Sequence, residues 1–352
     1  MNNLQVLGKF LDQPILVAKF QKAVPAVLAG TTAAYTAYNT HKAPKEEKIN
    51  TALKTGITLG IASASAVLAP KIASAITKRE LPPSLNTLKE NGKNIVDEFI
   101  ASNNIYKKTK KILNKSKDKI LNPKEVKTVF ENLSDKKSGQ EFLEKLIPSP
   151  QNITAKDIFS EIGYLSVLGA VPVAGGITGG IIADKVTDDS NWEEKIPNKI
   201  KEGSYQYLAN IFMCNVGAGA ALGILEHEGI TSKAARAIGM TAGIITTGIL
   251  GGSKIANFIG KNIIDPVCNK VFNKKENNKK YDDILILRDC KKHNYNKKNK
   301  EFKERTPEIL DIGLHTDDIA TVSLLSGLKW IEPALPIMYT VSGYRAGIGY
   351  RN

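Results

Sequence analysis

Long uncharged blocks alternate with strongly charged stretches along this chain. Residues 162–183 and 203–225 contain no charged side chain, and each block exceeds the roughly 18 residues that a membrane-spanning helix needs. Three further blocks are less uniform, being rich in Ala and Thr or interrupted by a lysine near one end: 23–40, 55–76 and 237–259. A sixth block, 319–344, is broken in its middle by Lys329 and Glu332. The pattern predicts an all-α, polytopic helical membrane protein with about six apolar segments.

A soluble protein with Gly/Ala-rich buried helices is the alternative to a membrane protein. Six such apolar blocks would leave too little amphipathic surface to cover them in water, and the lysine-rich connectors have the pattern of loops or solvated helices. We therefore expect an integral, multi-pass protein of a bacterial cell membrane, whose main partner is the lipid bilayer.

The charged stretches divide the chain into seven segments. In chain order we expect an amphipathic N-terminal segment, two membrane helices, a basic polar helical insert, a third membrane segment, two more membrane helices, a partly disordered basic polar insert and a Pro-broken sixth segment. Their bounds are 1–22, 23–77, 78–156, 157–184, 203–260, 261–317 and 318–346. The pattern "PKEVKTVFENL" in the first insert indicates a short amphipathic helix.

Two pairs of segments resemble each other, which predicts an internal repeat. Residues 56–76 and 239–259 share eight identities over 21 ungapped positions, where their composition alone would give roughly two or three. Residues 157–172 and 318–333 both begin with Asp-Ile, both end with Pro and both follow a threonine suited to capping a helix. The chain is therefore interpreted as two pseudo-repeats of three apolar segments.

The third segment of each half is compatible with two topologies. If both segments cross the bilayer, the second half is inverted relative to the first, as in many secondary transporters. If each segment instead enters and returns at its proline, both basic inserts lie on one side, which fits the positive-inside tendency better. The orientation in the membrane stays open.

Charges and prolines inside the sixth segment mark a candidate site. Lys329 and Glu332 are three residues apart, so they share a helix face and can pair. Pro333 breaks the helix beside Glu332, and Pro172 occupies the matching position in the first half. Pro-interrupted segments at corresponding positions of two halves indicate a transporter binding site. The candidate residues of a substrate or ion pathway are Lys329, Glu332, Pro333, Pro172, Glu161 and Asn215.

Glycines spaced four residues apart predict close helix packing. Small residues at this spacing let two membrane helices approach each other closely. The candidate packing positions are Gly56, Gly60, Gly175, Gly179, Gly239 and Gly243, with further pairs at Gly176 and Gly180 and at Gly343 and Gly347.

The chain of 352 residues has a formal net charge of +14. The basic runs adjoin apolar blocks and lack the interleaved aromatic residues of an RNA-binding pattern. We therefore expect the two basic inserts to bind anionic lipid headgroups, and we do not expect a nucleic-acid partner. Association into a homo-oligomer is left open.

No pattern in the sequence indicates catalysis, a metal site or a cofactor. The three cysteines do not form a disulfide framework, and Cys290 with His293 lacks the second ligand pair of a zinc site. The stretch "NVGAGAALG" (215–223) lacks the acidic residue and the strand context of a dinucleotide-binding loop. We therefore do not expect an enzyme.

Two functions remain after these exclusions. The first is a transporter or channel for a small solute or ion, which passes through the two-repeat helical bundle beside the charged and Pro-broken segments. The second is a membrane scaffold or assembly subunit that transports nothing and whose basic inserts bind anionic lipid or a protein partner. In the second case the Lys329 and Glu332 pair only locks two helices together.

Overall fold

The computed structural model describes residues 1–117, 119–148, 155–187, 191–230, 233–268, 270–271 and 329–349. In this part of the chain all regular secondary structure is helical, so the all-α prediction is confirmed there. Most of the second basic insert, the first part of the sixth segment and both expected threonine caps, Thr154 and Thr316, lie outside the described residues.

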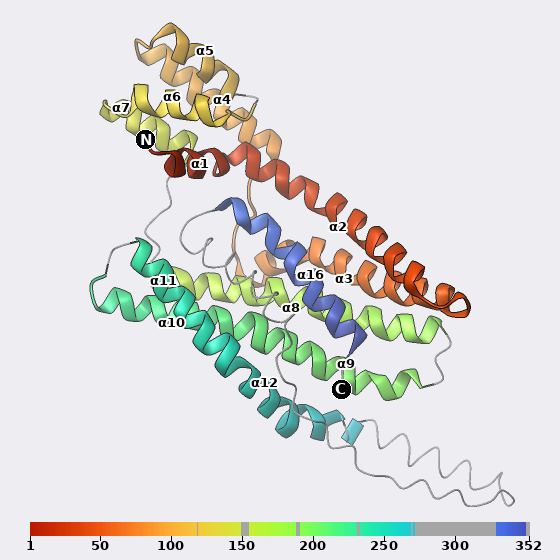
Figure 1. Cartoon of the computed structure of the whole chain (residues 1–352). Coiled ribbons are helices and arrows are strands. Elements are labelled where there is room, and N and C mark those ends of the chain that lie inside the picture. Colours follow the sequence, from red (N-terminus) through yellow and green to blue (C-terminus); the bar gives the residue numbers. More distant parts are fainter. Residues whose placement is uncertain are drawn as a thin grey trace, which may run out of the picture.

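The described helices outside the first insert form a bundle (Figure 1). Its α-helices are α2 (Pro14–Lys42), α3 (Lys48–Thr77), α8 (Ala155–Val186), α9 (Trp192–Tyr207), α10 (Met213–His227), α11 (Lys233–Ile244), α12 (Ser253–Ile259) and α16 (Leu335–Ile348). Shorter turns of π-helix continue some of them: η2 (Leu208–Phe212), η3 (Ile245–Gly252) and η4 (Gly260–Ile264). Two 3₁₀ turns, η1 (Lys45–Glu47) and η5 (Lys329–Ala334), precede α3 and α16.

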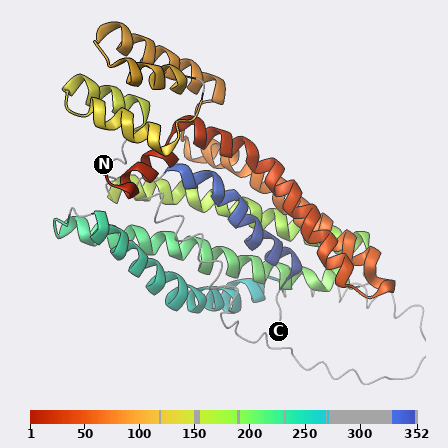
Figure 2. The ribbon, with the colours of Figure 1, turned by 45° about the horizontal axis from the view of Figure 1, so that its top comes forward.

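Helix α8 lies at the centre of the bundle. It packs against α3 and α16 on one side and against α9 and α10 on the other. In Figures 1 and 2 the α2–α3 hairpin and the hairpin from α9 to α12 flank α8 and α16. The largest buried cluster, which includes Leu165, Leu168 and Tyr339, joins α8 to α16 and to α3.

Three helices are long and apolar enough to cross a membrane: Lys45–Thr77, Phe159–Val186 and Trp192–His227. They contain the expected apolar segments at 55–76, 162–183 and 203–225, and they indicate membrane association. The expected segment 23–40 falls in α2 and the segment 237–259 falls in α11 to α12. The described helices therefore support three of the six expected spans.

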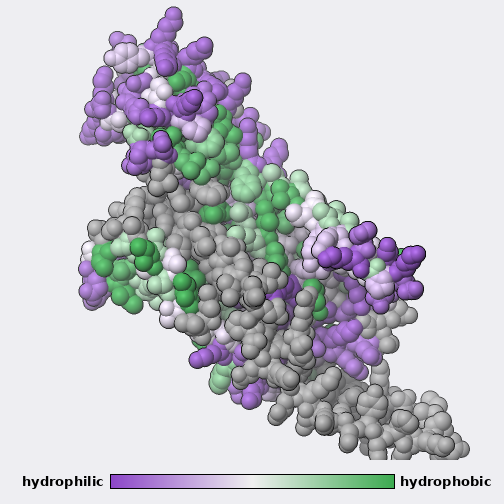
Figure 3. All heavy atoms as spheres, in the orientation of Figure 1, coloured by the Kyte–Doolittle hydropathy of each residue, from purple (hydrophilic) through white to green (hydrophobic). Residues whose placement is uncertain are grey.

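Large apolar side chains lie on the outer surface of the bundle. Leu68 and Ile76 on α3 are 52% and 63% exposed, and Ile238 on α11 and Phe258 on α12 are 70% and 66% exposed. Figure 3 shows hydrophilic residues over the first insert and over the turn from α2 to α3, with hydrophobic residues between them along α2. Exposed large apolar side chains of this kind suit contact with lipid or with another apolar partner.

The first basic insert folds around its own small core. Its helices are α4 (Leu85–Ser102), α5 (Lys107–Ser116), α6 (Pro123–Leu133) and α7 (Lys137–Leu146). The N-terminal helix α1 (Asn3–Leu11) packs against α6. Val96, Leu113 and Val126 are fully buried between these helices, and the rings of Phe99 and Phe142 stack with centroids 3.9 Å apart. The lysines of α4 to α7 surround this core.

A capping box starts α6. Asn122 Oδ1 accepts a hydrogen bond from the Glu125 backbone N–H at 2.9 Å, and Glu125 Oε2 accepts one from the Asn122 N–H at 2.8 Å. Lys115 Nζ donates to Glu125 Oε1 at 2.7 Å. Burial raises the pKa of the Glu125 carboxyl, but the hydrogen bonds from Lys115 and Asn122 outweigh burial and leave this pKa below its ordinary value.

The lowered pKa makes the stability of α6 depend on pH. The unfolded pKa of a glutamate is about 4.3, so the contribution of Glu125 is present above that pH and is lost as the pH falls through the lower folded pKa. Glu125→Gln should therefore speed hydrogen exchange of the α6 amides roughly twofold at neutral pH, because an exposed ion pair contributes about 0.5 kcal/mol. The two proteins should exchange alike in acid. The exposed Glu141→Gln on α7 is the control, and an equal effect of both substitutions would contradict the role of Glu125.

Candidate functional site

The end of α3 places Arg79 over α8. Lys78, the residue that caps α3, has a left-handed backbone with φ of 56°, a conformation that costs a residue other than glycine roughly 1 kcal/mol. The chain therefore turns sharply at Lys78, and the Arg79 side chain returns to the bundle. Arg79 Cζ lies 4.2 Å from the centroid of the Tyr164 ring on α8, within range of a cation–π contact.

Arg79 joins two carboxylates that are distant in sequence. Its Nη1 donates to Glu161 Oε2 on α8 at 2.9 Å, and its Nη2 lies 3.4 Å from Glu332 Oε1 on η5. The forked guanidinium suits this bridge because its donors lie in one rigid plane. The side chains of Arg79, Glu161 and Glu332 are 32%, 28% and 18% exposed, so the cluster is only partly shielded from solvent.

The Arg79 cluster lies where the apolar helices end. Arg79 follows the last turn of α3, Glu161 lies near the start of the apolar stretch of α8, and Glu332 precedes α16. Glu332 therefore lies in the 3₁₀ turn η5 before α16. Its charge is near the ends of the helices and not in the middle of the bundle. The side chain of Lys329 lies outside the described part of the chain, so its pairing with Glu332 stays a prediction.

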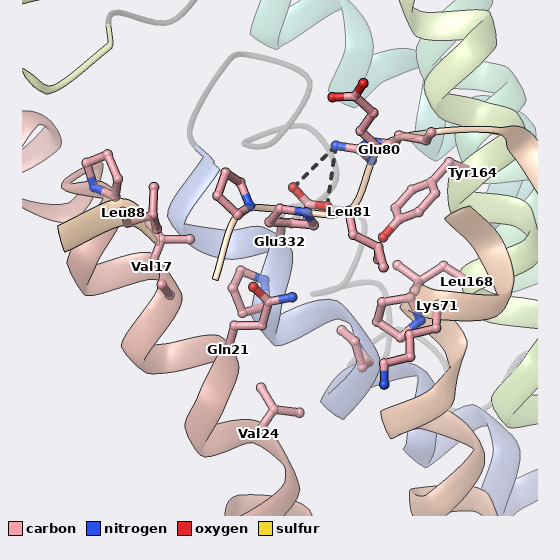
Figure 4. A pocket seen from close by; sticks show the side chains of 18 of the residues that line it. Val17, Gln21, Val24, Lys71, Glu80, Leu81, Leu88, Tyr164, Leu168 and Glu332 are labelled. Carbon is pink, nitrogen blue, oxygen red and sulfur yellow. Dashed lines mark hydrogen bonds and ion pairs between the residues drawn. The ribbon is translucent and has the colours of Figure 1, made fainter. Parts of the chain in front are cut away.

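A cavity of about 630 Å³ adjoins the Arg79 cluster. Figure 4 shows Val17, Gln21 and Val24 of α2 on one wall and Lys71, Tyr164 and Leu168 on the facing wall, with Glu332 between them. Most of the lining is apolar. The charged lining residues are Asp12, Lys71, Arg79, Glu80 and Glu332, so three acidic groups and two basic groups give the lining a formal charge of −1.

Prolines in three helices leave carbonyl groups at this cavity without their helical donors. Pro25, Pro70 and Pro172 lie inside α2, α3 and α8. Proline has no N–H, so in each helix the carbonyl four residues earlier loses its usual backbone hydrogen bond. These carbonyls belong to Gln21, Ala66 and Leu168, and all three residues line the cavity. The effect of all three prolines therefore falls on residues that line the cavity, of which Ala66 and Leu168 are at most 1% exposed.

The structure brings together some of the residues that the sequence predicts and separates others. Glu332 and Pro333 line the cavity, and Glu161 joins Glu332 through Arg79. Pro172 lies where α8 crosses α16 and does not line the cavity. Asn215 is buried on α10, away from the cavity, and its Nδ2 has no hydrogen-bond partner among the described residues.

Close glycine packing occurs at most of the expected positions. Gly176 and Gly180 of α8 meet Gly343 and Gly347 of α16, and a Cβ at any of these four would stand within 3.0 Å of a backbone atom across the interface. The other close positions are Gly175 and Gly179 against α3, and Gly239 and Gly243 against α10. Gly56 makes an ordinary contact with Thr36, and a Cβ at Gly60 would meet nothing within 4 Å.

The sequence prediction missed two polar features. One is Arg79, which ends the stretch "ITKR" directly after an apolar block. The other is a buried ladder along α9 and η2, in which Gln206 Nε2 donates to Glu202 Oε1 at 2.8 Å and Asn210 Nδ2 donates to Gln206 Oε1 at 2.9 Å. These three side chains are at most 2% exposed. Their spacing of four residues, which places them on one helix face, was the available signal.

The arrangement offers both apolar and charged groups for contact with a small molecule. The cavity combines apolar walls with a carboxylate whose cationic partner is shared with a second carboxylate. In the described residues no group of three His, Cys, Asp or Glu side chains could hold a metal ion. Comparisons with models of protein families, with curated proteins and with solved structures found no match to this chain.

Proposed function

We propose that this protein is a multi-pass membrane protein that binds a small solute or ion in the cavity beside Glu332 and moves it through the helical bundle. The observation that carries the proposal is the cavity itself, in which a carboxylate lies between apolar walls built from three Pro-interrupted helices. Polar groups and interrupted helices inside a membrane bundle are typical of substrate and ion pathways.

The lining favours a solute with an apolar body and a cationic group. Its formal charge of −1 attracts a cation, while Val17, Val24 and Leu168 offer apolar contact. A bound cation could replace Arg79 at Glu332 while Arg79 keeps its shorter contact with Glu161. Binding would then exchange one ion pair for another and would leave no charge uncompensated.

The proposal includes six apolar segments in two repeats. In the first repeat these are α2, α3 and α8, and in the second they are α9 with α10, α11 with α12, and the segment that ends in α16. The eight identities between 56–76 and 239–259 support it, because these ranges fall in α3 and in α11 to α12. The buried ladder of Glu202, Gln206 and Asn210 would supply polar groups within the second repeat.

Flux through proteoliposomes tests this function. Radiolabelled tetraethylammonium, a small cation with an apolar body, and radiolabelled rubidium are the probes. We expect the wild-type protein to take up one of them faster than protein-free liposomes do, and Glu332→Gln to reduce this uptake by about tenfold, because a lost contact worth roughly 1.4 kcal/mol is a factor of ten in affinity. Glu90→Gln, at an exposed position of α4, is the matched control.

The scaffold function is the second candidate, and the glycine interface between α8 and α16 favours it. Gly176, Gly180, Gly343 and Gly347 hold the two helices in close contact, and the insert presents its lysines on a separately packed core. If neither probe moves and Glu332→Gln only lowers the thermal stability, the cluster is a structural lock. The scaffold function, with lipid or a partner bound at the basic insert, then replaces transport.

A further inference from the structure

A second cavity lies at the opposite end of the bundle from the Arg79 cluster. It has a volume of about 490 Å³ and is enclosed by the first turns of α3, the last turn of α8, the start of α9 and the end of α16. Its polar lining residues include Lys54, Thr55, Asp184, Lys195, Asn198 and Lys199. We name it the basic pocket.

Two lysines share one aspartate inside the basic pocket. Lys199 Nζ lies 3.0 Å from Asp184 Oδ2, and Lys54 Nζ lies 3.4 Å from Asp184 Oδ1. The side chains of Lys199 and Asp184 are 4% and 7% exposed, whereas that of Lys54 is 38% exposed. Lys199 also donates to the carbonyl of Gly347 at the end of α16. The ammonium group of Lys199 is therefore fixed by contacts from α8 and α16.

The lining of the basic pocket is rich in cationic side chains. Lys54, Lys195 and Lys199 contribute three positive charges and Asp184 contributes one negative charge, which gives a formal charge of +2. The other polar side chains of the lining, Asn198, Thr55, Thr58 and Tyr344, can all donate hydrogen bonds. The pocket therefore matches an anion with several acceptor oxygens.

Aromatic side chains near the basic pocket are of the kind found at the level of lipid headgroups. Lys185 Nζ lies 5.6 Å from the Trp192 ring centroid, and Lys42 Nζ lies 4.6 Å from that of Tyr38. Tyr344, which lines the pocket, meets Tyr35 edge to face at 5.4 Å. Tyrosine and tryptophan are enriched where membrane helices enter the headgroup layer, and the three apolar helices Lys45–Thr77, Phe159–Val186 and Trp192–His227 all have an end here.

We infer that the basic pocket binds a phosphate group, presented either by an anionic phospholipid headgroup or as free inorganic phosphate. Lys54 and Lys195 contact the phosphate oxygens, and Lys199, held by Asp184 and Gly347, supplies buried positive charge behind them. Basic pockets between membrane helices near the headgroup layer are known binding sites for anionic lipids. The inference concerns a site remote from the cavity beside Glu332, and it does not depend on transport.

Lys195→Gln is the variant that tests the basic pocket. Lys195 is half-buried and belongs to the lining, and its replacement leaves the contacts of Asp184 with Lys54 and Lys199 in place. Lys185→Gln removes the same charge from an exposed residue next to Asp184 that does not line the pocket. The two variants have equal net charge, so nonspecific attraction of anions affects both alike.

Two probes distinguish the sources of the phosphate. The full chain, purified in detergent, is mixed with micelles that contain dioleoylphosphatidylglycerol or dioleoylphosphatidylcholine, and native mass spectrometry counts the lipids retained. Equilibrium dialysis with radiolabelled inorganic phosphate is the second measurement. A lipid headgroup is the ligand if the protein retains more phosphatidylglycerol than phosphatidylcholine. In that case Lys195→Gln should reduce the retention about fivefold, and Lys185→Gln should leave it unchanged. Saturable binding of phosphate, lost in Lys195→Gln only, establishes the free anion.

Two other outcomes overturn the inference. In the first, neither probe is retained by the wild-type protein, and the cluster of Lys54, Asp184 and Lys199 only joins α3, α8 and α9. In the second, Lys195→Gln and Lys185→Gln reduce retention equally, which means that surface charge alone attracts the anion. Thermal unfolding of both variants in the same detergent accompanies the binding measurements, so that loss of binding is credited only to a variant that unfolds at the wild-type temperature.

Discussion

Gly176→Ala is expected to separate α8 from α16. A Cβ at position 176 would stand within 3.0 Å of the Gly343 backbone, a distance that side-chain rotation cannot relieve because the obstacle is main chain. The helices must move apart, and the buried contacts of Leu165, Leu168 and Tyr339 loosen with them. Overpacking of a tight interface costs about 1–3 kcal/mol, occasionally more. We expect a loss of stability near the upper end of this range. Thermal unfolding of the detergent-solubilised protein measures this loss, and size-exclusion chromatography shows how much folded protein is recovered.

Gly163→Ala provides a control of opposite sign in the same helix. A Cβ at Gly163 meets nothing within 4 Å, and alanine is favoured over glycine inside a helix by roughly 0.5–1 kcal/mol. This variant should therefore be as stable as the wild-type protein or more stable. If Gly163→Ala and Gly176→Ala have the same effect on stability, the close contact between α8 and α16 does not exist as described.

The apolar helices were predictable because their signal is local. A run of uncharged residues such as 162–183 determines a long helix by length and composition alone, and the glycine spacing in α8 indicated one face for close packing. Which helix meets that face depends on packing across the whole bundle. The spacing gave the same signal for Gly60, where there is open space, as for Gly176, where the α16 backbone is in contact.

The candidate site was predictable in its acidic half only. Glu332 beside Pro333 and Glu161 near the start of a span are anomalies in their local sequence, so both could be recognised. Arg79 lies 82 residues from Glu161 and 253 residues from Glu332, and in sequence it resembles the basic residues that follow many membrane helices. Its role depends on the left-handed turn at Lys78, which lysine gives no reason to expect.

The same limit applies to the prolines near the cavity. Pro172 was recognised as an interruption of α8, but its effect falls on the Leu168 carbonyl one turn earlier. Pro25 and Pro70 act in the same way on α2 and α3. A sequence shows each proline alone, and only the packing of three helices shows that the affected residues face one cavity.

Arg79→Met is expected to destabilise the end of the bundle that holds the cavity. The substitution keeps the length and apolar stem of the side chain but leaves Glu161 and Glu332 without their shared cation. Removing one partner of a fully buried ion pair costs about 3–5 kcal/mol. Because these side chains are 18% to 32% exposed, water screens part of the repulsion and we expect a loss of about 1–2 kcal/mol in thermal unfolding at neutral pH. Lys93→Met at an exposed position of α4 should have little effect.

A double-mutant cycle separates loss of the ion pairs from loss of packing against Tyr164. Glu332→Gln removes one of the two carboxylates, so the cost of Arg79→Met should be smaller in the Glu332→Gln background than in the wild-type background. A coupling energy of about 0.5 kcal/mol or more between the two substitutions would show that the charges interact. Additive effects would instead attribute the loss to the contact of Arg79 with the Tyr164 ring, 4.2 Å away. The carboxylate of Glu332 would then have no cation to exchange with a solute, and the ion-exchange step proposed for binding would fail with it.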